Sequence, residues 1–185
     1  MYKKIIKYLS LLIPGLLALY ILLPIGDCSS GIAHGLGFVF FELIFILIFI
    51  VIIIIQIVKA KNIKFDYIPI GIFFIQSLLL YLSFTSKDRK FWTVPVITAK
   101  IDDKNIHRSS SLTLYKNNSF NAKHRFVDFS HSYQGSYTIS NDTLYLERED
   151  LPQITEGLFT TIYLINQKDK TITPIDRNFL NLRIE

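Results

Sequence analysis

Side chains capable of acid–base or metal chemistry are spread through the second half of this 185-residue chain. The candidates are imidazoles and carboxylates, namely His107, His124, His131, Asp102, Asp103 and Asp128. The sequence contains no H-E-x-x-H, no G-x-S-x-G and no glycine-rich phosphate loop. The serine triplet at 109–111 is better explained as a loop than as a nucleophile. We therefore expect no catalytic residue and no enzymatic activity.

A second group of possible metal ligands, Asp27, Cys28 and His34, lies in the stretch GDCSSGIAHGLG. Its ligand types are mixed and follow no repeated spacing, so we expect neither a metal site nor a cofactor. Cys28 is the only cysteine, which excludes an internal disulfide.

Glu42 is the most informative single polar residue because it lies inside the apolar run Leu36–Val58. An acid within a membrane span implies a polar partner, contact with another subunit, or an ion or proton path. Glu42 lies about 9 Å from the outer end of that run. We expect it to pair structurally, with Tyr20, Tyr81 or Ser83 as the candidate partners.

Three apolar segments require a membrane, because they are apolar around their whole circumference and long enough to cross about 30 Å of hydrocarbon. The predicted helices cover about 8–25, 36–58 and 67–84 and make up a membrane region of residues 1–90. Pro14 is expected to kink the first helix. That segment also has the layout of a cleaved signal peptide, and the sequence before Cys28 loosely resembles a lipobox. We favour retention, because two further apolar segments follow and no clean cleavage site is present.

Several residues of this region have expected roles in packing or anchoring. Gly31 and Gly35 form a G-x-x-x-G that would serve helix packing if the second span began this early, and otherwise belong to a plain loop. Helix–helix hydrogen bonds are expected from Gln56 and Gln76. The residues expected at the membrane interface are Tyr67, Tyr81 and Trp92.

The net charge of +5 is concentrated around these helices. Residues 1–90 contain nine Lys and Arg against four Asp and Glu, whereas residues 91–185 are balanced. Nucleic acid is therefore excluded as a partner. With the N-terminus in the cytoplasm, six cations flank the spans inside and three outside, which favours an extracytoplasmic C-terminal domain. The composition is typical of a bacterial cytoplasmic-membrane protein.

Residues 91–185 alternate apolar and polar side chains in short runs, which predicts an all-β antiparallel meander: a barrel, half-barrel or sandwich. The predicted strands are Val94–Ile101, Ser111–Tyr115, Ser119–Phe126, Tyr133–Ile139, Thr143–Glu147, Phe159–Ile165, Thr171–Ile175 and Leu180–Ile184.

Hairpin registers follow from burial, since a slip of one residue would turn every side chain over. The predicted pairs are Ile139 with Leu144, Tyr137 with Leu146, Leu114 with Phe120, Leu112 with Ala122, and Ile165 with Ile172. Asn141-Asp142 then forms a two-residue turn, and Asn118 adopts the left-handed conformation.

The run Gly135 to Leu146, GSYTISNDTLYL, resembles a strand–turn–strand of small lipocalin-like bacterial β-domains. The resemblance implies a meander and transfers no functional residue.

Three functions remain open. The first is a non-enzymatic membrane protein that presents its β-domain to a protein partner or to a second copy, as an accessory subunit or an immunity-type factor. The second is a β-barrel that binds a lipid or small molecule, which a solid core would exclude. The third is a small channel or transport component that uses Glu42.

Overall fold

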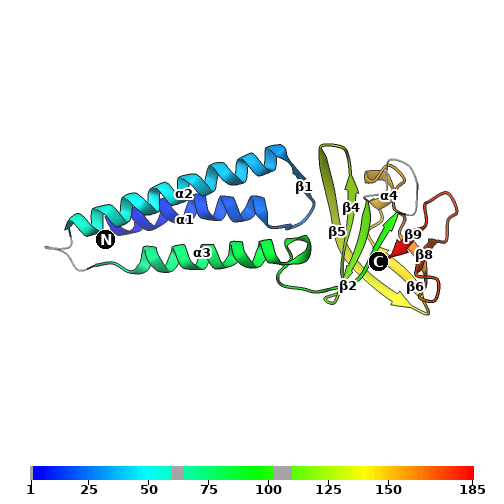
Figure 1. The fold of residues 1–185 in the computed structure, drawn as a ribbon. Coiled ribbons are helices and arrows are strands. Elements are labelled where there is room, and N and C mark those ends of the chain that lie inside the picture. The colour runs from blue at the N-terminus through cyan, green and yellow to red at the C-terminus, as the bar shows by residue number, and fades with distance from the viewer. Residues whose placement is uncertain (1, 60–64, 102–109) are drawn as a thin grey trace. The chain divides into compact units, whose positions relative to one another are not determined.

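The computed structural model describes residues 2–59, 65–101 and 110–185, and these divide into two compact units (Figure 1). One unit comprises Met1–Pro24 and Ile32–Phe91, and the other Ile25–Gly31 and Trp92–Glu185. The second unit therefore recruits seven residues from the connection between the first two helices. The predicted boundary follows residue 90, whereas the two units divide between Phe91 and Trp92, and the prediction did not include the contribution from residues 25–31.

The first unit contains the three predicted apolar helices, α1 (Tyr2–Leu22), α2 (Ile32–Lys59) and α3 (Ile68–Thr85). By length and composition all three could cross a membrane. At 1.5 Å per residue, α2 is about 42 Å long and exceeds a typical hydrocarbon core. It begins four residues before the predicted span, whereas α1 ends before Pro24.

Aromatic and aliphatic side chains pack the helices together. Phe45 and Ile52 of α2 are buried with Leu11 of α1. Phe49 of α2 stacks on Phe73 of α3 with 4.4 Å between ring centroids. A short 3₁₀ turn, η1 (Lys87–Arg89), follows α3.

The second unit is a closed antiparallel barrel of the eight described strands β2 to β9, in simple meander order. Their bounds are β2 Pro95–Ile101, β3 Ser111–Tyr115, β4 Ser119–Arg125, β5 Phe129–Ser140, β6 Thr143–Glu147, β7 Ile162–Asn166, β8 Thr171–Pro174 and β9 Leu182–Ile184. Pairing of β2 with β9 and of β5 with β6 closes the sheet. Closure removes the exposed edges that an open meander would present.

All five predicted cross-strand pairs are present. The turn residues Asn118, Asn141 and Asp142 have φ of 59°, 47° and 62°. These left-handed values are the ones that tight hairpins of this twist require. Burial of one face therefore suffices to set the register of these hairpins.

The barrel interior is filled by side chains from every strand. The buried core residues are Ala99, Ile101, Leu112, Leu114, Phe120, Ala122, Tyr137, Leu144, Leu146, Leu151, Leu158, Phe159, Tyr163, Ile165, Ile172 and Leu182. Leu151 comes from α4 (Leu151–Ile154), a single helical turn between β6 and β7 that the strand pattern did not predict. Ile139, expected in the core, is half exposed near the end of its hairpin.

Strand β1 (Cys28–Gly31) lies in the connection between α1 and α2 and adds a ninth strand to the sheet. It pairs antiparallel with the first four residues of β5, Phe129 to Ser132. The plain-loop interpretation of this connection is therefore wrong. β5 starts four residues earlier than predicted, because that part of the strand is hydrogen-bonded on both sides, to β1 and to β4.

Candidate functional site

Glu42 forms part of a polar link between the membrane helices. Its carboxylate accepts a 3.4 Å hydrogen bond from Nε2 of Gln76, which also donates to the carbonyl oxygen of Gly15 at 2.9 Å. Gln76 thus joins α3 to both α1 and α2, and it is only 6% exposed. The partner of Glu42 is therefore Gln76, and the predicted choice among Tyr20, Tyr81 and Ser83 was wrong. Ser83 donates instead to the carbonyl oxygen of Leu79 in its own helix. A helix that is apolar on all sides has no sequence pattern that tells which face packs against its neighbours. The residue opposite Glu42 could therefore not be predicted.

The glycine at which the helices approach closely is Gly15. A Cβ there would lie 3.1 Å from the ring of Phe45 in α2 and 3.3 Å from Oε1 of Gln76 in α3. The helix-packing interpretation of Gly31 and Gly35 is wrong for Gly31, which lies in β1 against the Cβ of Phe129. Gly35 is helical, but a Cβ there would meet no described atom within 4 Å.

A second polar cluster joins α1 to the residues just before α3. Asp66 accepts hydrogen bonds from Nζ of Lys7 at 2.7 Å and from the hydroxyl of Tyr8 at 2.8 Å. Burial alone raises the pKa of the Asp66 carboxyl, but these hydrogen bonds outweigh it and lower the pKa. Gln56 accepts from the backbone N–H of Asp66 at 2.8 Å, so it fixes a connection rather than a neighbouring helix.

The predicted interfacial anchors have exposed rings. Tyr67 precedes α3, Tyr81 lies toward its end, and Trp92 begins the C-terminal part of the second unit. Exposed amphipathic rings of this kind suit the headgroup region of a bilayer, and their role there stays a prediction.

Within the second unit, Arg148 ties the α1–α2 connection to the barrel. Its guanidinium forms a two-point ion pair with both carboxylate oxygens of Asp27, at 2.5 and 2.6 Å. It also bonds Asp150 at 2.9 Å and donates to the carbonyl oxygen of Gln134 at 2.8 Å. Gln134 in turn donates from Nε2 to the carbonyl oxygen of Gly26 at 2.6 Å. We call these five residues the Arg148 lock.

Electrostatics follows from this geometry. The Arg148 guanidinium lowers the pKa of the Asp27 and Asp150 carboxyls below their ordinary values, and the two acids raise the pKa of Arg148. Asp27 is therefore a charged partner of arginine. Among the described residues no three His, Cys, Asp or Glu side chains lie close enough to hold a metal.

His124 and His131 are direct partners across β4 and β5, although their sequence spacing gave no shared geometry. They lie in an aromatic cluster: Phe126 is 4.1 Å from the ring of His124 and stacks on Phe129 at 4.5 Å. The cluster therefore has the character of aromatic packing. Asp102, Asp103, His107 and Ser109 lie outside the described residues.

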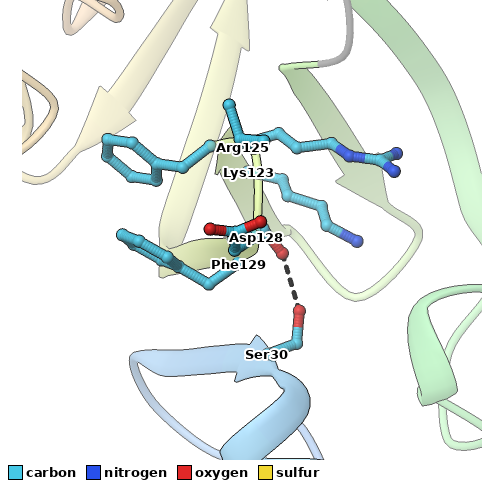
Figure 2. A pocket seen from close by; sticks show the side chains of 9 residues that line it. Ser30, Lys123, Arg125, Asp128 and Phe129 are labelled. Atoms are coloured by element: carbon cyan, nitrogen blue, oxygen red, sulfur yellow. Dashed lines mark hydrogen bonds between the residues drawn. The ribbon is translucent and has the colours of Figure 1, made fainter.

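The other face of the same hairpin carries basic and hydroxyl side chains around a cavity of about 280 Å³ (Figure 2). The lining residues come from β1, β4, the turn and β5: Ser30, Gly31, Lys123, Arg125, Phe126, Val127, Asp128, Phe129 and Ser130. We call this the hairpin cavity. The sequence alone does not reveal this cavity, because its β1 wall meets the hairpin only once β1 pairs with β5.

The outer wall of the barrel carries a contiguous apolar patch, made of Tyr145, Ile162, Leu164 and Ile175. Tyr145 pairs with Ile162 across β6 and β7, and the N–H of Ile175 bonds the carbonyl of Ile162. Leu164 lies two residues from Ile162 and so on the same face. Tyr145, Leu164 and Ile175 are all exposed. We call this set the outer patch.

Comparison with protein-family models, with curated proteins and with solved structures found no match. The lipocalin-like resemblance of the Gly135–Leu146 hairpin therefore stays a prediction, and function must be argued from the two units themselves.

Proposed function

We propose that this protein is a non-enzymatic membrane protein whose β-barrel binds a protein partner through the outer patch. The observation that carries the proposal is a barrel filled on the inside and apolar on part of its outside. The patch lies on regular strands of a closed barrel, so it needs no rearrangement to receive a partner.

The filled interior weighs against ligand binding inside the barrel. Phe120 approaches Gly135 so closely that a Cβ on that glycine would lie 2.6 Å from the ring. Leu112, Leu114 and Leu144 are fully or almost fully buried in the same core. A barrel of eight strands is only just wide enough for its own side chains, and here they occupy it.

The outer patch has the composition of an interface core. It combines one tyrosine with three aliphatic side chains, and aromatic residues are enriched where proteins meet. Thr138, the ladder partner of Tyr145, and Thr173, the partner of Leu164, border the patch. An apolar centre with a polar margin is the usual organisation of such surfaces.

We further propose that the first apolar segment is retained and that the barrel is extracytoplasmic in a bacterial cytoplasmic membrane. The polar links from α1 to Gln76 and Asp66, and the contact of Asp27 with Arg148, support retention. The lysine distribution supports the orientation. The side of the membrane is tested with Cys28→Ser/Lys168→Cys: a membrane-impermeant maleimide should label intact cells, and labelling only after permeabilisation would reverse the assignment.

Glu42 gives no support to a transport function, because its hydrogen bond to Gln76 is the helix-to-helix pairing expected of a structural acid. We therefore assign it a structural role.

The test of the proposed function is crosslinking at the patch. A photoreactive amino acid replaces Leu164 in the full-length chain in cells, and the matched control replaces Lys168 in the exposed β7–β8 turn. A partner specific to the patch should crosslink at position 164 and not at 168. Purification of Leu164→Lys in mild detergent should then lose that partner. A crosslinked product of twice the chain mass would identify a second copy. Identical patterns at both positions, or recovery of the wild-type chain alone, would refute the proposal.

A further inference from the structure

We propose that the hairpin cavity binds the phosphate group of an anionic lipid headgroup. The inference concerns the β4–β5 hairpin and does not depend on the outer patch. It rests on three features of the same hairpin: paired bases, a hydroxyl pair, and an exposed apolar tip.

Lys123 and Arg125 supply the positive charge. They lie two residues apart on β4, and Figure 2 shows their side chains extending side by side, away from the Asp128 carboxylate. No described residue forms an ion pair or a hydrogen bond with either side chain. Two adjacent cations that the described residues leave unpaired favour an external anion.

Ser30 and Ser130 supply hydroxyl groups at the floor of the cavity. They are ladder partners on β1 and β5, and their Oγ atoms are 2.6 Å apart (Figure 2). Arg125 is the next partner of Ser130 across the sheet, so the hydroxyls and the guanidinium lie in one row. One hydroxyl donates to the other, which leaves one O–H free to donate to a phosphate oxygen.

The exposed apolar side chains at the tip of the hairpin favour a membrane lipid over a soluble molecule as the source of that phosphate. Val127 is 94% exposed and Phe129 is 43% exposed, with Phe126 stacked on Phe129. Exposed apolar side chains beside basic ones characterise surfaces that lie at a lipid interface. Phe129 pairs with Gly31, and the next residue along the chain, Ile32, is the first of α2. Along the chain, the β1 wall of the cavity is therefore followed directly by a helix that is long and apolar enough to cross a membrane.

The experiment measures lipid binding to the full-length protein in a neutral detergent by native mass spectrometry. The probes are phosphatidylglycerol, phosphatidylcholine and inorganic phosphate. The cavity variant is Lys123→Gln/Arg125→Gln, and the matched control is Lys168→Gln/Arg177→Gln, which removes the same charge from exposed positions. Each basic residue near an anionic surface contributes about fivefold in affinity. The cavity variant should therefore bind phosphatidylglycerol about 25-fold more weakly than wild type, with the control unchanged.

A further variant, Val127→Ser, removes an apolar side chain that is almost fully exposed, adds no charge to the cavity and so does not threaten the fold. It should weaken phosphatidylglycerol binding severalfold and weaken binding of inorganic phosphate much less. If phosphate displaces the lipid and Val127→Ser has no effect, the site takes soluble phosphate and the lipid assignment is wrong. Equal lipid binding by the cavity variant and its control would overturn the proposal entirely.

Discussion

Replacing Arg148 by methionine should release β1 from the barrel without unfolding the barrel. Methionine reproduces the aliphatic stem of arginine and is apolar, so it retains much of the packing while it removes the ion pair, the bond to Asp150 and the bond to the Gln134 carbonyl. The backbone ladder and the Ser30–Ser130 hydroxyl pair hold β1 against β5, and the Arg148 lock fixes Asp27, the residue just before β1. Loss of the lock should therefore loosen this pairing.

The size of the effect follows from exposure. Arg148 is 17% exposed and Asp27 is 44% exposed, so solvent screens the pair in part. Exposed pairs contribute about 0.2–1 kcal/mol, and hydrogen bonds to charged groups about 1.5–3 kcal/mol. We expect a local cost of about 1.5 kcal/mol, which corresponds to a roughly tenfold larger equilibrium constant for local opening of β1.

Hydrogen exchange followed by mass spectrometry is the appropriate assay. Amides of residues 28–31 and 129–132 should exchange about tenfold faster in Arg148→Met. The strands β7 and β8 should be unchanged. Arg183→Met in β9 is the matched control, because it removes an arginine from the same unit at a site distant from β1 in the sheet order. Unchanged exchange at β1 in Arg148→Met would refute the reasoning.

The remaining predictions concern pH, packing and the turns. Because the pKa of Asp27 is lowered, protection of β1 should be constant above the ordinary carboxyl range and lost as the pH falls through the lowered pKa, as a pH series of the same exchange measurement will show. Gly135→Ala should destabilise the barrel by about 1–3 kcal/mol in chemical unfolding, and Phe120→Leu should relieve part of that cost; simple additivity would contradict this. Gln76→Leu should weaken helix association by about 0.6 kcal/mol per lost hydrogen bond in a detergent unfolding titration, and an unchanged midpoint would oppose it. Asp142→Val should cost about 1–2 kcal/mol of unfolding free energy, whereas Asp142→Gly should not destabilise.

The sequence was enough to predict most of the barrel's hairpins, because the alternation of buried and exposed residues and the residue types in the turns indicate the same registers. Leu112, Leu114 and Phe120 alternate with polar neighbours, and Asn-Asp provides the left-handed turn, so only one register buries the apolar set. Helix existence was equally predictable, since only a bilayer accommodates segments apolar on all sides.

What escaped prediction depends on tertiary pairing. Cys28-Ser29-Ser30-Gly31 has little intrinsic strand preference and becomes β1 only against β5. Arg148 follows a strand as one of many charged residues, and nothing in its spacing marks Asp27, 121 positions earlier, as its partner. The sequence likewise does not tell which face of each apolar helix packs against its neighbours. Gln76 could therefore not be predicted as the partner of Glu42.

The position of β1 between two membrane helices has a consequence for biogenesis and for protein engineering. During synthesis this strand emerges about a hundred residues before β5, with which it pairs, so it must wait while α2 and α3 are inserted. A truncated chain that starts at Trp92 would lack it. The first half of β5 would then present unpaired backbone donors and acceptors to any neighbouring molecule. A soluble version of the barrel should therefore supply Asp27 to Gly31 again, for instance as a segment fused ahead of Trp92, to prevent edge-to-edge aggregation.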